Sequence, residues 1–154
     1  MFRARFFAPA LLIAGAVFLG SGCLQVSEIR YDEKKCEKDG VLIHITHGDN
    51  DPHRVLTALD MADRMAGIKE VLVYFDIEGV SVVLKDSEDL QYSHFSSSKT
   101  QIRKLLDKGV NIYVCPGDLK AAGKGPEDVA EGVRIAKKED FFNFTRGRIL
   151  TLDY

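Results

Sequence analysis

Apolar residues follow two patterns in the last three quarters of the chain. Between short apolar runs, residues spaced three or four apart form the apolar stripes of two predicted helices, 52–66 and 98–108. Strands that alternate with helices favour a mostly parallel sheet with helices on both of its faces. The apolar runs that predict the strands lie at 41–46, 69–76, 110–114 and 148–153.

Residues that begin and end helices support both predicted helices. Asp51 is placed to cap the first helix, with Pro52 in its first position. Ser98 and Gln101 have the spacing of a capping box for the second helix, and Gly109 follows as its stop. Both helices are therefore expected to begin at defined residues.

Other segments carry weaker patterns. Residues 77–95 are expected to hold either a short helix or a strand around 80–84, followed by a loop. A loop with one helical turn is expected over 117–125, and Pro126 with its acidic neighbours opens a further predicted helix. The phenylalanine-rich stretch 138–146 predicts another helical segment.

The first 22 residues predict an export signal. Two arginines precede an apolar run from Phe6 to Leu19, which is shorter than the roughly 20 residues of a membrane span. Small residues then lead to Cys23, which resembles a bacterial lipoprotein signal whose cysteine is lipidated, although Gly20 stands where an aliphatic residue is typical. Simple cleavage and a retained anchor are the alternatives. We expect export to the bacterial cell envelope or periplasm, with membrane contact only through an N-terminal lipid anchor.

The remaining chain divides into a tether and one domain. Residues 23–39 are mostly polar and charged without periodicity, so they predict a tether, and this tether contains Cys36. The domain is expected to span 40–154. A composition of 45% apolar and 29% charged residues is that of one globular domain. The net charge of −2, with both signs mixed along the chain, gives no footprint for nucleic acid.

Cys115 is the first candidate for chemistry. It follows the predicted strand 110–114 and precedes Pro116 and Gly117, and in α/β folds ligands bind at the carboxyl ends of parallel strands. A helical turn that begins there would direct free N–H groups at the sulfur and stabilise the thiolate, which is the nucleophilic form. The alternative is a small, buried and unreactive side chain.

Histidines offer a competing site. His44 is expected to be a satisfied core residue of the first strand, and His53 to lie in the first turn of the first helix. His47 would leave the same sheet edge as Cys115 if their strands were neighbours, and it would then serve the thiol as a base or cationic partner. His47, Asp49 and Cys115 are ligand types for zinc or copper. His94 lies in the loop that ends the segment 77–95, where it could reach over the site, but no spacing argument supports it. Because His44 and His53 are accounted for by the fold, we predict no bound metal and no other cofactor.

Several runs match a known family. They are Val-Leu-Val-Tyr-Phe at 71–75, Ile-Leu-Thr-Leu-Asp-Tyr at 149–154 and, most specific, Gly-Val-Asn-Ile-Tyr-Val-Cys at 109–115. Over 40–154 the chain resembles the DsrE/DsrF-like sulfur-relay family. The resemblance implies a three-layer, flavodoxin-like α/β fold and assembly as a homo-oligomer, a trimer or hexamer. In sulfurtransferase members, the cysteine that matches Cys115 carries a persulfide, whereas other members keep the fold with no established activity.

Two functions follow as hypotheses. The first is an envelope sulfur carrier or sulfurtransferase that uses Cys115, with a donor or acceptor protein or a small thiol as its partner. The second is a non-catalytic oligomeric binding module in which Cys115 is merely buried. An exported thiol meets an oxidising compartment, but a disulfide needs Cα atoms within roughly 7 Å. Cys36 and Cys115 are expected at opposite ends of strands about 20 Å long, so their pairing would require the tether to fold back.

Overall fold

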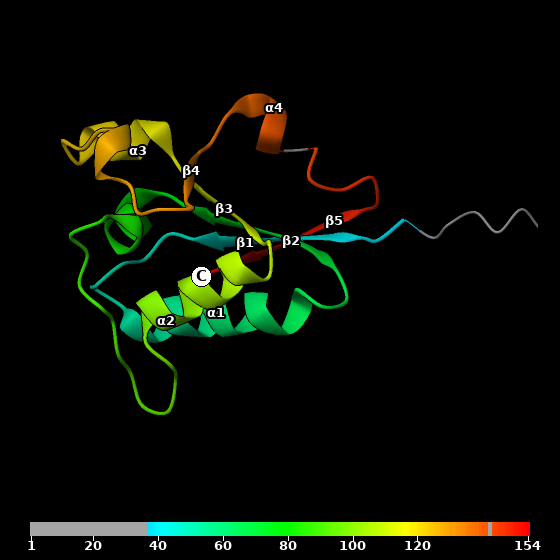
Figure 1. Ribbon diagram of the computed structural model, residues 1–154, viewed down its shortest axis with the longest axis horizontal. Coiled ribbons are helices and arrows are strands. Elements are labelled where there is room, and N and C mark those ends of the chain that lie inside the picture. The colour runs from blue at the N-terminus through cyan, green and yellow to red at the C-terminus, as the bar shows by residue number, and fades with distance from the viewer. Residues whose placement is uncertain (1–36, 142) are drawn as a thin grey trace, which may run out of the picture. The chain divides into compact units, whose positions relative to one another are not determined.

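A five-stranded sheet organises the domain, and all pairings between its strands are parallel (Figure 1). The computed structural model describes residues 37–141 and 143–154, so the predicted export signal, Cys23 and Cys36 lie outside the described residues. The strands are β1 (Gly40–Ile45), β2 (Glu70–Phe75), β3 (Asn111–Val114), β4 (Arg134–Ile135) and β5 (Ile149–Asp153). Their order across the sheet is β4-β3-β2-β1-β5.

Helices cover both faces of this sheet, which confirms the predicted three-layer, flavodoxin-like α/β fold. In Figure 1, α1 and α2 lie below the sheet, and α3 and α4 lie above it. The helices are α1 (Pro52–Met65), α2 (Ser98–Asp107), α3 (Pro116–Ala121) and α4 (Lys138–Phe141), with 3-10 helices at Ile77–Val83 and Pro126–Asp128.

The main core lies between the sheet and α1. Side chains alternate along a strand, so Ile43 and Ile45 of β1 share a face with Val73 and Phe75 of β2, and all four are fully buried. The buried residues of α1 repeat at the predicted spacing and fill the other side: Val55, Leu56, Ala58, Leu59 and Ala62. The predicted cap is confirmed as well, because Asp51 accepts a hydrogen bond from the backbone N–H of Arg54.

The predicted capping box of α2 is wrong. Helix α2 begins at Ser98 itself, after Ser97, and Ser98 is buried. The hydroxyl of Ser98 instead accepts a hydrogen bond from the N–H of Leu90 at 2.9 Å, and the side chain of Gln101 donates to the carbonyl of Ser96 at 2.8 Å. Both side chains therefore hold the preceding loop against the helix rather than capping it.

The segments with weak patterns differ most from the predictions. The 3-10 helix Ile77–Val83 agrees with the short-helix alternative for the segment after β2, whereas the helix predicted to open at Pro126 is only the 3-10 turn Pro126–Asp128. Among the described residues of the phenylalanine-rich stretch, helical structure is confined to α4, and the two-residue strand β4 was not predicted. These segments are too short for a hydrophobic period to build up.

The order of the strands also corrects one expectation. Strand β2 lies between β1 and β3, so the strand that leads to His47 is not a neighbour of the strand that leads to Cys115. Both strands still end at the same edge because they are parallel. No helix within the described residues is long and apolar enough to cross a bilayer.

Candidate functional site

Cys115 lies where β3 turns into α3. Its N–H donates to the carbonyl of Phe75 at 2.8 Å, which extends the pairing with β2 by one residue. Its carbonyl accepts from the N–H of Leu119 at 3.0 Å and so begins α3, with Pro116 in the first helical position. The backbone of Cys115 is therefore held by a strand and a helix at once, while its side chain is partly exposed.

Two polar side chains interact with the sulfur of Cys115. Burial, together with a hydrogen bond to Cys115, raises the pKa of Tyr74 far above its usual value. The pKa of Asp118 is lowered by the N–H of Ile77, which donates to its carboxylate at 3.0 Å, and by a hydrogen bond with Cys115.

Helix α3 begins directly after Cys115, as predicted, but the Cys115 side chain makes no capping hydrogen bond with it. Tyr74, whose pKa is raised by burial and by Cys115, is the neighbour that sequence reasoning missed. The register between β2 and β3 is the feature that could have revealed Tyr74. Tyr74 pairs with Tyr113, and side chains two residues apart on a strand share a face. Tyr74 and Cys115 therefore project to the same side.

The surroundings of His44 are more polar than those expected for a core residue. Its Nδ1 lies 2.7 Å from a carboxylate oxygen of Asp153 on β5, and its Nε2 lies 2.8 Å from one of Asp76, just after β2. Burial lowers the pKa of His44, but the hydrogen bonds to Asp76 and Asp153 outweigh it, so the pKa is raised. Because only a protonated imidazole donates from both nitrogens, this arrangement favours the cation. Its ring also stacks on Tyr74, with centroids 5.6 Å apart.

His47 follows β1 and interacts with its own neighbour. Its Nδ1 lies 3.0 Å from the hydroxyl of Thr46. Two strand spacings, about 10 Å, separate β1 from β3. Nothing in the described part of the chain joins His47 to Cys115, and a role for His47 beside the thiol stays a prediction.

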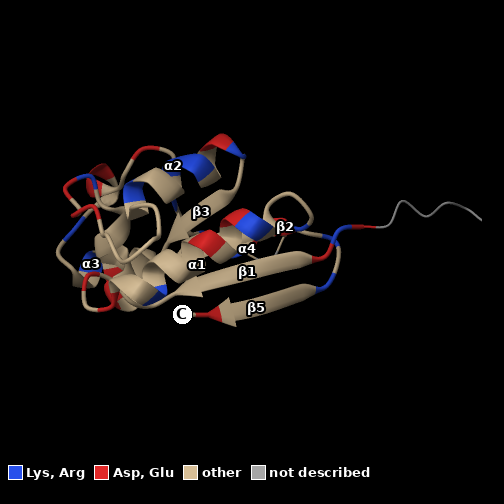
Figure 2. Cartoon of the chain, turned by 90° about the horizontal axis from the view of Figure 1, so that it is seen from below, with Lys and Arg blue, Asp and Glu red and all other residues tan. Residues whose placement is uncertain are grey.

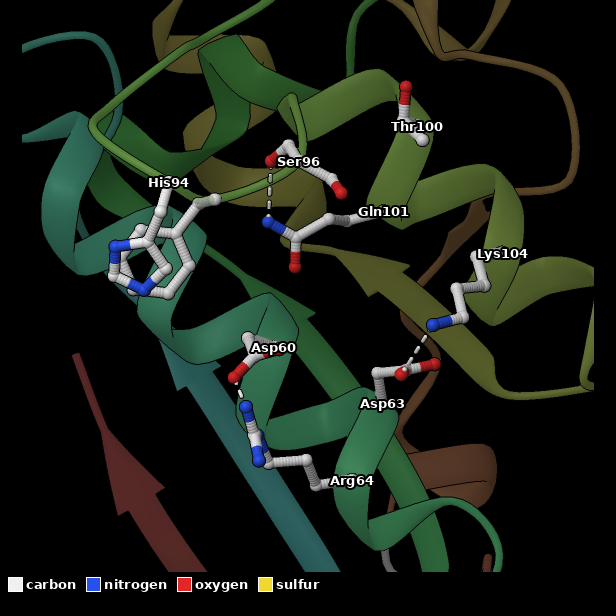
Figure 3. Close-up of a pocket in the computed structure, with 9 residues that line it drawn as sticks. Asp60, Asp63, Arg64, His94, Ser96, Thr100, Gln101 and Lys104 are labelled. Carbon is white, nitrogen blue, oxygen red and sulfur yellow. Dashed lines mark hydrogen bonds and ion pairs between the residues drawn. The ribbon is translucent and has the colours of Figure 1, made fainter.

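The remaining histidines lie near the long loop before α2. His53 is in the first turn of α1, as predicted, and stacks on Tyr92 with centroids 4.5 Å apart. His94, for which the sequence offered no spacing argument, stacks on Phe95. Both His94 and Phe95 line a hollow of about 270 Å³ between this loop, α1 and α2 (Figure 3).

The charges that line this hollow are paired with one another. Figure 3 shows Arg64 directed at Asp60, and Lys104 directed at Asp63. The contacts measure 2.6 Å and 2.8 Å between nitrogen and oxygen. These pairs join turns of α1 and bind α1 to α2, so they serve packing, and Cys115 is not among the residues that line the hollow.

Metal ligands are not gathered in the described residues. No group of three or more histidine, cysteine, aspartate or glutamate side chains there is arranged to hold an ion. The two carboxylates beside His44 occupy both of its nitrogens, which a metal would need.

Comparison with known proteins supports the fold. No family model matches the chain. The uncharacterized protein MJ0760 of Methanocaldococcus jannaschii is 27% identical over 124 residues, which are 75% of this chain and 45% of that protein, so the chain spans less than half of the relative's length. Two solved structures match 75% of this chain and 99% of their own, each with a TM-score of 0.52. They are a protein of unknown function, MTH1491, from Methanobacterium thermoautotrophicum, at 21% identity, and the ychN protein from E. coli, at 11%.

At these identities the two structures show the fold alone. The shared architecture is the parallel α/β sheet described above. The chain thus shares the α/β fold of these two proteins.

Proposed function

We propose that this protein is a DsrE-like sulfur carrier, with sulfurtransferase-like chemistry, that forms a persulfide on Cys115. The supporting observation is a partly exposed thiol at the carboxyl edge of the sheet, held where β3 turns into α3. A carrier needs a thiolate to attack a sulfane sulfur and an exposed position from which to pass that sulfur on. A donor protein, an acceptor protein or a small thiol would be its partner.

Persulfide detection tests this proposal. Purified full-length protein is incubated with thiosulfate or polysulfide, and the mass gained at each cysteine is measured. Cys115 should gain one sulfur atom, Cys115→Ser should remove that gain, and Cys36→Ser should keep it. A parent protein that gains no sulfur at Cys115, or gains it equally at Cys36, would overturn the proposal.

A non-catalytic oligomeric binding module is the second candidate. The observation that favours it is β5, which lies at the edge of the sheet with Ile149 and Leu150 exposed. Strands of parallel sheets are normally covered on both faces, so a second copy of the chain would complete this edge in a trimer or hexamer. This candidate predicts assembly without persulfide formation, and the test above separates the two.

The proposal places the protein in the bacterial cell envelope or periplasm, anchored by a lipid on Cys23. Its basis is the sequence of the first 23 residues alone. Bacterial cells fed a labelled fatty acid should label the parent protein and not Cys23→Ser. Equal labelling of both proteins, or none of the parent, would contradict lipidation at this residue.

A further inference from the structure

We infer that the amino-terminal edge of the sheet is a docking surface for an anionic lipid bilayer. This edge consists of the segments at and just before the starts of β1, β2, β3 and β5, which are 37–39, 66–70, 108–110 and 143–148. Cys115 lies at the opposite, carboxyl-terminal edge, so docking would leave the thiol facing away from the membrane. The inference rests on the proposed envelope location and states how the anchored domain is oriented there.

Basic residues gather at the amino-terminal edge. The starts of the strands lie at one level, because Gly40 pairs with both Glu70 and Ile149. The four segments contain five basic and three acidic residues, and the last turns of α1 and α2 beside them add two of each sign. At least one basic residue precedes each of these strands: Lys38, Lys69, Lys108 and, before β5, both Arg146 and Arg148.

The opposite edge is strongly acidic. The segments at and after the ends of the strands, 46–51, 76–97, 115–133 and 153–154, contain twelve acidic residues and three lysines. Figure 2 shows this contrast along β5, which has a basic start and an acidic end. Strands about 20 Å long separate the two edges, whereas salt screens a charge over about 10 Å. An anionic bilayer therefore acts mainly on the edge that faces it, and it favours the amino-terminal edge.

Two cations of this edge are available to lipid phosphates. Lys38 and Arg146 are exposed, and neither belongs to an ion pair among the described residues. Lys69 and Arg148, by contrast, contact the carboxylate of Asp39 at 3.5 Å and 3.0 Å. Lys38 and Arg146 are therefore the residues whose charge an anionic surface would meet first.

Ile68 adds an apolar contact at the same edge. It lies between α1 and β2, directly before Lys69, and 65% of it is exposed. Ile77 at the opposite edge is 61% exposed, but it lies between Asp76 and Glu78, which an anionic surface repels. Proteins bind at the surface of a bilayer through apolar area and cations together, so Ile68 is suited to the headgroup region and Ile77 is not.

The course of the chain brings the amino-terminal edge to the membrane. Residue 37 precedes β1 at this edge, and the predicted export signal with Cys23 comes before it. Only residues 24–36 separate Cys23 from Glu37, so the edge stays within about 50 Å of an anchored cysteine even when these residues are fully extended. Anchoring raises the local concentration of the two surfaces, so a few cations and one isoleucine suffice for docking.

Quenching of a fluorophore by lipid tests the docking. The full-length chain carries Cys23→Ser, Cys36→Ser and Cys115→Ser, and a single new thiol from Ile68→Cys or Ile77→Cys bears an environment-sensitive dye. An N-terminal histidine tag binds the chain to vesicles through a nickel-chelating lipid, so the anchor does not depend on lipidation. The vesicles contain about 30% phosphatidylglycerol and a lipid that carries a spin-label quencher.

The dye at position 68 should be quenched at least about threefold more than the dye at position 77 at low salt, because only the amino-terminal edge is attracted to the surface. Salt at about 0.5 M should remove most of this difference, since it screens the attraction between cations and lipid phosphates. Vesicles in which phosphatidylcholine replaces phosphatidylglycerol should do the same.

Charge reversal at the two edges provides matched variants. Lys38→Glu with Arg146→Glu should reduce the quenching at position 68 to about a third or less, because each change replaces an attracted charge with a repelled one. Lys99→Glu with Lys120→Glu makes the same change to two exposed lysines at the acidic edge. This control should stay within about 1.5-fold of the parent, since these lysines lie beyond the screening distance.

Stronger quenching at position 68 that depends on anionic lipid, on low salt and on Lys38 with Arg146 supports the docking. Equal quenching at both positions, stronger quenching at position 77, no effect of salt or lipid, or equal losses in the two charge-reversal variants overturns it. If the variant with two glutamates does not fold, Lys38→Gln with Arg146→Gln decides by the same criteria. Failed fatty-acid labelling refutes lipidation, and failed persulfide formation refutes the carrier function, so these failures are distinguishable from a failure of docking.

Discussion

At the scale of single residues, His44 couples the fold to pH. Two carboxylates from different strands hold its imidazole, and both bonds are complete only when the ring is protonated. A raised pKa in the folded state means that folding is favoured by proton binding. The stabilisation is therefore full below the unfolded pKa of about 6.5 and is lost as the pH rises through the higher folded value.

His44→Gln should show this coupling. The substitution should lower stability by about 1 kcal/mol in mildly acidic solution, since the pair with Asp153 is partly exposed to solvent. The difference from the parent should shrink as the pH rises past neutrality. Denaturant unfolding at a series of pH values measures it, and a difference that is constant or grows with pH would contradict the assignment.

Single residues also show how much of the candidate site can be predicted from the sequence. Cys115 was found because its strand, stop signal and position are local features of the chain. The partners of His44 are 32 and 109 residues away, and Tyr74 meets Cys115 only through strand register. The spacing of residues along the sequence does not predict contacts between segments so far apart. The polar surroundings of His44 and the position of Tyr74 on the strand beside Cys115 were therefore found only in the structure.

At the scale of elements, the 3-10 helix Ile77–Val83 closes the carboxyl edge near the site. Gly79 lies against the end of β1, where its N–H donates to the carbonyls of Asp76 at 2.8 Å and Thr46 at 3.2 Å. A Cβ at this position would collide with the backbone carbonyl of Ile45. The backbone of one element thus approaches another so closely that only glycine fits.

Gly79→Ala should therefore destabilise the domain by about 2 kcal/mol or more, because strand or helix must shift to admit a methyl group. Chemical denaturation provides the measurement. Gly67→Ala is the matched control, since a Cβ there meets no atom within 4 Å, and it should be close to neutral. Equal stabilities of the two variants would show that the edge can adjust freely.

Elements with a clear hydrophobic period were predicted correctly. The runs behind β1, β2, β3 and β5 and the stripes of α1 and α2 each extend over several residues, and each element appears in the structure. Strand β4 and helix α4 have two and four residues, fewer than a period needs to be recognised. The expectation that β1 and β3 are neighbours was wrong for a different reason. Which strands lie side by side depends on the connections between them rather than on the sequence of any one strand.

At the scale of the whole molecule, one row of apolar residues runs across three strands and is buried everywhere except on β5. Leu150, Val41 and Val71 are partners across β5, β1 and β2, and their exposed fractions are 57%, 4% and 7%. In Figure 2, uncharged positions fill β5 between a basic start and an acidic end. We therefore propose this exposed edge as the contact between copies in the binding module put forward above.

Leu150→Asp should therefore shift the protein from oligomer toward monomer, because the charge would be buried in the interface. Light scattering after size-exclusion chromatography measures the mass. Ile68→Asp places the same charge on an equally exposed apolar residue away from β5, and it should leave the mass unchanged. An unaltered oligomer in Leu150→Asp would exclude this edge as the contact.

The pairing of the first strand with the last bears on how the chain acquires its shape. Residues as far apart as Gly40 and Ile149 must meet before the outer side of β1 is satisfied. During synthesis, that side of β1 stays open until β5 has been made. A product that stops before β5 would therefore keep β1 as an unpaired edge strand, which invites pairing with other chains.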